Sequence, residues 1–487
     1  RIHRAFPEGL RAVDDDGNSP LHLIKNERNA EWCVRKNPDL CRVANNLGEL
    51  PLHIAAKVPL SADALGTFVD AYPEALEKPT NAGELPLHYV VKAPAYSGIA
   101  SFREIADRHP EGAQVEDENG ALPVHHFMRS RGASKIHTMD LLDRLAECAP
   151  ESVRAADGDG NTILHLADDP VKIAWAVEKR PDLCGVPNAD GDLPLHMLRN
   201  VYSGGRSYRA GVESSPRIGA VLSMIDANPD ALKTVNDQGR LPLHKATYCR
   251  SEPILRRFID GYPEGPSRAD GDGRLPIHHW MEDRGPACVV YETNCLRMLH
   301  DAHPEGLAAI DGDGNTPLHL AADGYRIAWA LRTRPETCRA RNRKGEYPLH
   351  LVEFGAVSTK LMSQMIDQEP ESLTQVDTAK GNTPLHNAIM RGARSGIVRW
   401  LLDKNPAAAS LCNRDGRLPL HLFCRRKPSD GDDQKQRIFG EVLNAIVEAH
   451  PNGLVMADQD GNIPAHYARV NGHCNDIVKS LETPPSG

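Results

Sequence analysis

Residues 311–324 read DGDGNTPLHLAADG, and this stretch supports three interpretations. Asp311, Asp313 and Asn315 resemble the first ligand positions of a calcium-binding loop. His319, with acidic residues upstream, has the chemistry of a catalytic or metal-binding imidazole. Alternatively, the whole stretch is a tight turn followed by the start of a helix. A single copy of the stretch would favour chemistry, whereas many copies would favour structure.

The histidine of this stretch belongs to a repeat that runs along the chain. Histidines in the same context recur at a mean spacing of 37 residues, at positions 22, 53, 88, 125, 165, 196, 244, 278, 319, 350, 386, 421 and 466. A glycine stands five residues before each of these thirteen histidines, and a proline stands two residues before all of them except where Ile163 replaces it. A second proline lies 15 residues before each histidine, apart from Pro370 at 16. We number the thirteen repeats 1 to 13 by these histidines.

Each repeat has a fixed half and a variable half. From a histidine forward to the next marker proline the distance varies from 16 to 33 residues, so all insertions fall there. In the fixed half, Asp-Gly pairs predict a tight turn, and the proline suits the first turn of a helix. The variable half predicts two short helices, the second of which ends at the next marker proline. The residues expected to cap the first helix are Ser19, Thr162, Thr316 and Thr383.

The stretch GNTPLHLAA at 314–322 resembles the signature of the ankyrin repeat family, and the resemblance covers essentially the whole chain. It implies an all-α fold, an α-solenoid of about 13 ankyrin-like helix-turn-helix repeats with short turns or hairpins between them. Leu replaces the usual Thr before the proline in seven repeats, and a proline replaces the familiar Gly-Ala after the second helix. We therefore expect helix lengths and curvature that differ from those of consensus arrays.

A longer period groups the repeats into blocks of four. The sequence predicts one continuous solenoid over 1–487, with blocks that begin near residues 7, 150 and 304, a last partial block at 451–482 and a disordered tail at 483–487. The residues that recur at block spacing are Trp32, Trp175 and Trp329, Cys41, Cys184 and Cys338, and Phe127, Trp280 and Phe423. We expect these side chains to pack in the core between neighbouring repeats.

The thirteenfold repetition weakens the chemical interpretations. A calcium loop that starts at Asp311 requires Gly at position 6 and Glu at position 12, where this chain has Thr316 and Ala322. The repeat histidines should stack about 10 Å apart, too far for shared zinc coordination. The doublets His125–His126 and His278–His279 lack cysteines at zinc-ligand spacing, and no nucleotide-binding, metalloprotease or hydrolase motif is present. The sequence predicts no catalytic residue, no metal and no cofactor.

The composition of the chain limits the classes of partner that it is expected to bind. A net charge of −9 argues against broad nucleic-acid binding. No run approaches the roughly 18 apolar residues of a membrane helix, so membrane insertion is not expected. Eleven cysteines without a CxxC pair indicate reduced thiols in an intracellular compartment, the cytoplasm, with the nucleus left open.

Two surface segments are candidate contacts. The resemblance implies a protein-protein interaction scaffold or adaptor that binds a protein or peptide. The segment RTRPETCRARNRKGEY at 332–347 is basic and favours an acidic partner; its candidate residues are Arg339, Arg341, Arg343 and Lys344. The insertion at 200–219 contains residue types that are common in binding hot spots, Tyr202, Arg206 and Tyr208. Each segment also has an interpretation without partner binding: the first would be a solvated turn and the second a disordered loop.

A different class of function stays open at the sequence level. The array would equally serve as a regulatory or substrate-docking region of a larger enzyme whose catalytic domain lies outside this sequence. A spacer without a partner is the third alternative.

Overall fold

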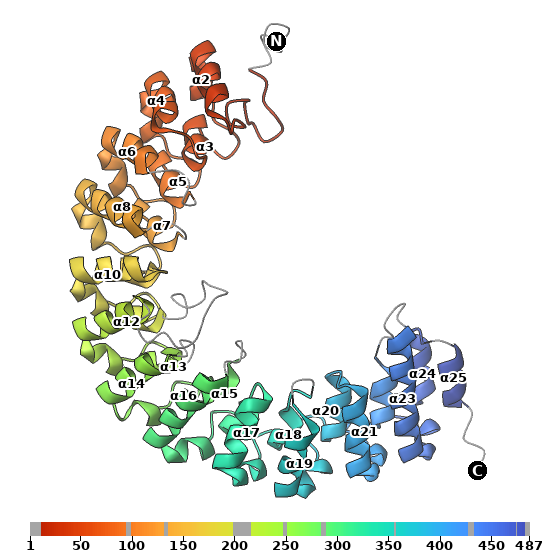
Figure 1. Cartoon of the computed structure of the whole chain (residues 1–487). Coiled ribbons are helices and arrows are strands. Elements are labelled where there is room, and N and C mark those ends of the chain that lie inside the picture. Colours follow the sequence, from red (N-terminus) through yellow and green to blue (C-terminus); the bar gives the residue numbers. More distant parts are fainter. Residues whose placement is uncertain are drawn as a thin grey trace. The chain divides into compact units, whose positions relative to one another are not determined.

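The computed structural model describes residues 11–93, 99–130, 135–197, 216–246, 251–283, 289–354, 357–426, 433–473 and 475–482. The chain divides into two compact units, residues 1–265 and 266–487, each a row of stacked helix pairs (Figure 1). The described residues contain no β-strand. This confirms the all-α fold class and the α-solenoid of helix-turn-helix repeats, while one continuous solenoid across both units stays a prediction.

The first helix of each repeat begins at the proline two residues before the repeat histidine, and it is short. In repeat 1 these residues form a turn. In repeats 2 to 13 the first helices are α3 (Pro51–Lys57), α5 (Pro86–Lys92), α7 (Pro123–Arg129), α9 (Ile163–Leu166), η7 (Pro194–Met197), α13 (Pro242–Ala246), α15 (Pro276–Glu282), η12 (Pro317–Leu320), α18 (Pro348–Leu351), α20 (Pro384–Met390), α22 (Pro419–Cys424) and α24 (Pro464–Val470).

The second helix of each repeat is longer, and in repeats 1 to 12 it ends two residues before the next marker proline, close to the predicted end. The second helices are α2 (Glu27–Lys36), α4 (Ala62–Ala71), α6 (Ile99–Arg108), α8 (Lys135–Cys148), α10 (Pro170–Lys179), α12 (Pro216–Ala227), α14 (Glu252–Gly261), α16 (Val289–Ala302), α17 (Gly324–Thr333), α19 (Thr359–Gln368), α21 (Ser395–Lys404), α23 (Asp433–Ala449) and α25 (Asn475–Glu482).

A short 3₁₀ helix, which the sequence analysis did not predict, follows most second helices. It usually starts at the marker proline, whose fixed φ suits the first turn of a helix. These elements are η2 (Pro38–Arg42), η3 (Pro73–Glu77), η4 (Pro110–Gln114), η5 (Pro150–Val153), η6 (Pro181–Gly185), η8 (Pro229–Lys233), η10 (Gly265–Ser267), η11 (Pro304–Ala308), η13 (Pro335–Arg339), η14 (Pro370–Leu373), η15 (Pro406–Ser410) and η16 (Pro451–Leu454).

The Asp-Gly clusters form the predicted turns. The Asp311 carboxylate accepts the backbone N–H groups of Asp313 at 3.0 Å and Asn315 at 2.8 Å. Gly314 closes the turn with a φ of 79°, and the glycine five residues before each of the other repeat histidines also has a positive φ. Asp311 is buried and its Oδ1 bonds the backbone, so this carboxylate holds a turn together.

The repeat histidine joins two repeats through both of its ring nitrogens. Nδ1 of His319 accepts the backbone N–H of Thr316 at 3.0 Å, and Nε2 donates to the carbonyl of Glu346 in the next repeat at 3.1 Å. From His22 to His421, every repeat histidine accepts this bond from the residue three positions earlier, at 2.9–3.2 Å. The imidazole therefore caps its own helix in the way that Glu or Gln does in a capping box.

The side chains that recur at block spacing are mostly buried, as predicted. Trp175 is 1% exposed, and its indole N–H donates to Asp143 of α8 at 2.9 Å. The prediction is wrong for Trp32, which is 42% exposed, and Trp329 is only half-buried. Trp32 lies in α2, and no described helix precedes α2 to cover it in the way that α8 covers Trp175. The other buried members of the set are Cys41, Cys184, Cys338, Phe127, Trp280 and Phe423.

No helix in the described ranges combines the length and the apolar character that crossing a membrane requires.

Candidate functional site

Backbone hydrogen bonds join the hairpin turns of neighbouring repeats. In residues 266–487, the N–H of Arg343 donates to the carbonyl of Asp313 at 2.9 Å. The N–H of Thr378 donates in the same way to Lys344 at 2.6 Å, and that of Arg414 donates to Lys380 at 2.8 Å. These bonds fix the turns of repeats 9 to 12 side by side, so side chains at equivalent turn positions form a row.

The structure brings three of the predicted basic residues together on one hairpin. Arg341, Arg343 and Lys344 lie between η13 and α18, and all three are exposed. Asn342, between them, is buried and accepts the N–H groups of Lys344 and Glu346 at 2.9 Å each, which holds the turn in place. The Arg341 guanidinium lies 4.7 Å from the centre of the Tyr347 ring, a cation–π arrangement.

Arg339, the fourth predicted residue, belongs to a different element. It is the last residue of η13, and its Nε donates to the carbonyl of Gln368 at 3.2 Å. The Glu369 carboxylate lies 3.9 Å away. Arg339 is therefore already engaged by the C-terminal end of α19, the second helix of its own repeat.

Two further cations, which were not predicted from the sequence, lie on the same surface. Lys380 and Arg414 are exposed on the turns of repeats 11 and 12, which are bonded to the turn of Lys344. The signal was present in the sequence, because Lys344 and Lys380 both directly precede a turn glycine, and Arg343 and Arg414 both precede one by two residues. We call Arg341, Arg343, Lys344, Lys380 and Arg414 the basic hairpin row.

Acidic residues bound the basic hairpin row at both ends. Asp313 is exposed on the preceding turn, and Asp460 is exposed on the turn of repeat 13. At that second end, Arg417 contacts Asp415 at 2.7 Å and Asp460 at 2.8 Å, so these charges neutralise one another. The positive potential is thus confined to three neighbouring turns.

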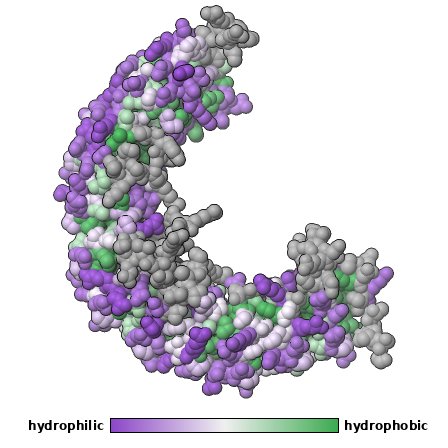
Figure 2. Space-filling view, in the orientation of Figure 1, coloured by the Kyte–Doolittle hydropathy of each residue, from purple (hydrophilic) through white to green (hydrophobic). Residues whose placement is uncertain are grey.

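A shallow hollow of about 260 Å³ lies beside two of these turns. Val376, Cys412 and Arg414 are among its lining residues, and all three are exposed. Its size is below the range of small-molecule pockets, so it suits one side chain of a macromolecular partner. On the face seen in Figure 2, hydrophilic residues dominate and hydrophobic ones occur in small patches.

The candidates in the long insertion lie outside the described residues. Tyr202, Arg206 and Tyr208 fall in the segment between residues 197 and 216, and the predicted tail at 483–487 also lies outside the described ranges. Their proposed roles stay predictions.

The thiols near the basic hairpin row include one that is inert. Cys338 is buried, and burial raises the pKa of its thiol to about 12, so it stays protonated at neutral pH. The described cysteines are free thiols.

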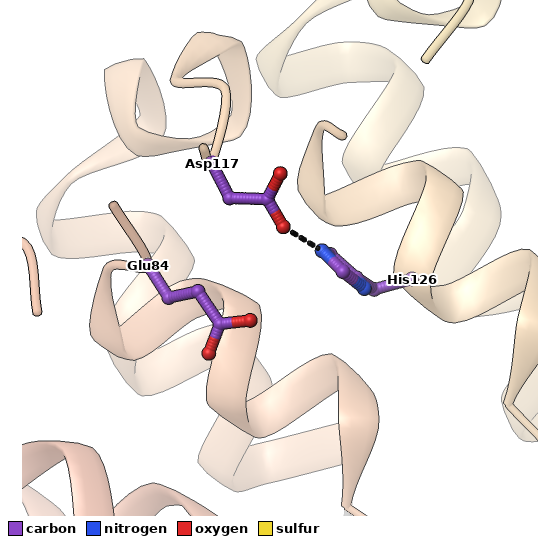
Figure 3. Close-up of side chains that lie close together, drawn as sticks. All are labelled: Glu84, Asp117 and His126. Carbon is purple, nitrogen blue, oxygen red and sulfur yellow. Dashed lines mark hydrogen bonds and ion pairs between the residues drawn. The ribbon is translucent and has the colours of Figure 1, made fainter. Parts of the chain in front are cut away.

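A separate cluster of metal-ligating side chains lies in residues 1–265. Single ligand atoms of Glu84, Asp117 and His126 lie within 4.8 Å of one another (Figure 3). None of these three residues belongs to the basic hairpin row.

Comparison with known proteins supports the repeat assignment. Residues 373–423, which include Lys380 and Arg414, match the family model described as ankyrin repeats in many copies. Among solved structures, the chain is similar to the ankyrin repeat domain of Bcl-3, a member of the IkappaB protein family, with 18% identity, a TM-score of 0.31, 60% of this chain covered and 99% of that chain. It is also similar to one chain of a complex between a predatory endopeptidase of Bdellovibrio bacteriovorus and an immunity protein, with 17% identity, a TM-score of 0.31, 39% of this chain covered and 91% of that chain. No curated protein matches this sequence.

Proposed function

We propose that this chain, whose residues 373–423 match the ankyrin repeat family model, is a protein-interaction scaffold that binds an acidic segment of a partner along the basic hairpin row. The role is noncovalent and needs no catalytic group. It is compatible with a cytoplasmic protein, where free thiols stay reduced.

The observation that carries the proposal is the lack of intramolecular neutralisation in the row. Among the described residues, no carboxylate forms an ion pair with the side chain of Arg343, Lys344 or Lys380. The side chain of Arg414 likewise pairs with no described carboxylate and donates to the backbone carbonyl of Ala379 at 3.4 Å. By contrast, Arg334 of the same compact unit, whose side chain is 24% exposed, pairs with Glu305 at 3.0 Å. The row therefore offers its charges to an outside partner.

The spacing of the turns suggests the form of the partner. Stacked helices lie about 8–10 Å apart, and an extended peptide rises about 3.3 Å per residue. An extended segment with Asp or Glu at about every third residue would therefore place one carboxylate at each turn. Each exposed ion pair contributes about 0.2–1 kcal/mol, so the row supplies an increment of affinity and specificity rather than the whole binding energy.

The proposal is tested with a panel of fluorescent peptides that differ in acidic spacing, titrated into the full chain at constant ionic strength. In the test variant Arg343, Lys344, Lys380 and Arg414 are changed to Glu. In the matched control Arg28, Lys36, Lys78 and Arg103, which are exposed in the other compact unit, are changed to Glu. Both variants have the same net charge.

We expect the test variant to bind the best acidic peptide at least about tenfold more weakly, and the control to bind it nearly as the native chain does. Equal losses in the two variants would mean that only net charge matters. The absence of binding by the native chain to any acidic peptide of the panel would overturn the proposal.

A further inference from the structure

The cluster of Glu84, Asp117 and His126 joins two neighbouring repeats. Glu84 follows the turn glycine of repeat 3, whereas Asp117 begins the turn of repeat 4 and His126 lies on α7. Nε2 of His126 and Oδ2 of Asp117 are 2.7 Å apart, and the Glu84 carboxylate faces them (Figure 3). These are an imidazole and two carboxylates, the ligand types that zinc accepts.

The cluster is partly shielded and its aspartate is held in place. The side chains are 12% exposed for His126, 1% for Asp117 and 16% for Glu84. Oδ1 of Asp117 accepts the backbone N–H groups of Asn119 and Ala121 at 2.9 Å each. Hydrogen bonds of this kind orient a ligand before a metal binds, and they leave Oδ2 directed at His126.

An unpartnered buried nitrogen lies beside the cluster. His88 is fully buried, and its ring lies edge-on to His126 with the centroids 5.6 Å apart. Its Nδ1 accepts the N–H of Leu85 at 3.0 Å, so Nε2 carries the proton. That Nε2 has no hydrogen-bond partner among the described residues, whereas Nε2 of His53, in the preceding repeat, donates to the carbonyl of Glu84 at 3.2 Å.

A buried N–H without an acceptor destabilises the fold, which points to an acceptor that belongs to a bound ligand. A water or other oxygen held on a metal ion in this cluster would be such an acceptor.

The chain offers two comparisons at equivalent positions. Tyr89 occupies in repeat 3 the position of His126 in repeat 4, and its hydroxyl donates to Glu49 at 2.8 Å, so this position accepts a non-ligating aromatic. In repeat 8, His279 and Asp270 form the same pair at 2.9 Å. There the position equivalent to Glu84 is Arg240, so the third carboxylate is absent from the sequence.

We propose that Glu84, Asp117 and His126 bind a divalent transition-metal ion of the zinc class and that this ion ties repeat 3 to repeat 4. His126 would contribute Nε2 and each carboxylate one oxygen, with a further position open to water. The metal competes with Lys92, whose ammonium forms an ion pair with Glu84. The site is independent of the basic hairpin row.

The test uses the full chain, with its accessible thiols alkylated, stripped by a chelator and titrated with Zn²⁺ by calorimetry and with Co²⁺ by absorption. The test variant is His126→Tyr, because Tyr89 shows that the fold accommodates this residue at the position. The matched control is His279→Tyr, which removes the pair of His279 with Asp270, a pair that has no third carboxylate at the position equivalent to Glu84.

We expect the native chain and His279→Tyr to bind one more equivalent of metal than His126→Tyr, or to bind that equivalent about a hundredfold more tightly. Zn²⁺ should also raise the Tm of the native chain and leave that of His126→Tyr unchanged. Equal stoichiometry and affinity in the native chain and His126→Tyr would overturn the proposal.

A second variant protects the test against misfolding. Asp117→Asn keeps the turn, since Asn45 occupies the equivalent position and its Oδ1 accepts N–H groups from Leu47 and Glu49 at 3.0 and 2.9 Å. If His126→Tyr loses its helical circular dichroism, Asp117→Asn must show the same loss of one equivalent for the proposal to stand.

Discussion

At the residue scale, the repeat histidine works only as a neutral imidazole. Nδ1 of His386 accepts the N–H of Thr383 at 3.2 Å, so it carries no proton, and Nε2 faces the carbonyl of Arg417 at 3.1 Å, so it must carry one. Protonation of Nδ1 would place two donors face to face. The histidine at 319, which looked like a candidate for chemistry, is therefore a hydrogen-bonding bridge between repeats.

Removal of one such bridge should destabilise the array. His386→Ala leaves the N–H of Thr383 and the carbonyl of Arg417 short of a partner in a buried site, so we expect a loss of about 2–4 kcal/mol in the free energy of unfolding. The measurement is urea denaturation followed by circular dichroism. His466→Ala is the matched control, because His466 is exposed and lacks this pair of bonds in the described structure. A loss of similar size in both variants would contradict the bridging role.

The same residues predict how stability depends on pH. Burial lowers the pKa of His278, His319 and His386 from 6.5 to about 4. Because the unfolded chain binds protons at a higher pH than the folded chain, the contribution is fully present above about pH 6.5 and falls as the pH drops toward 4.

The urea midpoint should therefore stay level above about pH 6.5 and decrease between pH 6.5 and 5, with a smaller decrease in His386→Ala. A midpoint that stays constant or rises over this interval would contradict the assignment.

At the element scale, a buried cationic or imidazole side chain marks each described block boundary. Lys172, Arg326 and His473 each lie seven residues after the histidine that opens a block. Lys172 donates to the carbonyl of Met128 at 3.1 Å and also contacts that of Ser130, Arg326 donates to Trp280 at 3.0 Å, and His473 donates to Arg426 at 2.7 Å. In each case the acceptors lie in or just beyond the first helix of the preceding repeat, where helix carbonyls lack partners. The four-repeat period thus has a physical basis in how the repeats dock.

Lys172 is the sharpest test of this docking. The Lys172 side chain is 2% exposed and also contacts Asp168 at 3.0 Å. Lys172→Met would leave a carboxylate and two carbonyls without their cation, so we expect the free energy of unfolding to fall by about 3–5 kcal/mol. Lys172→Arg should retain most of the stability, because Arg326 occupies the equivalent position in the next block.

The control for Lys172→Met is Lys179→Met, which removes a 46% exposed lysine from the same helix. We expect this change to lower the free energy of unfolding by less than about 1 kcal/mol. The measurement is again the urea midpoint. Equal costs for Lys172→Met and Lys179→Met would contradict the docking role.

At the scale of the whole molecule, the features that recur in each repeat could be predicted from the sequence, whereas the contacts between neighbouring repeats could not. The turns, the proline-initiated first helix and the buried Cys184 follow from local patterns that thirteen copies make unmistakable. The 3₁₀ helices escaped prediction because an element of three to five residues has no hydrophobic period. Lys380, Arg414 and the pairing of Glu84 with His126 escaped because their neighbours lie in the next repeat, more than 30 residues away along the chain.

The charge of the whole chain makes a last prediction about the basic hairpin row. An acidic peptide is repelled by the net charge of −9 at long range and attracted by the row at short range. The Debye length is about 30 Å at 0.01 M salt, about 10 Å at 0.1 M and about 3 Å at 1 M, so added salt first removes the distant repulsion and only then the contact attraction.

The affinity of the native chain for its best acidic peptide should therefore change little or rise between 0.01 and 0.1 M salt and fall steeply between 0.1 and 1 M, as measured by fluorescence anisotropy. The variant with Glu at 343, 344, 380 and 414 should lose the steep fall, because it has no local attraction to screen. A native-chain affinity that drops most between 0.01 and 0.1 M would mean that binding depends on long-range attraction, which a locally basic row on an acidic protein cannot supply.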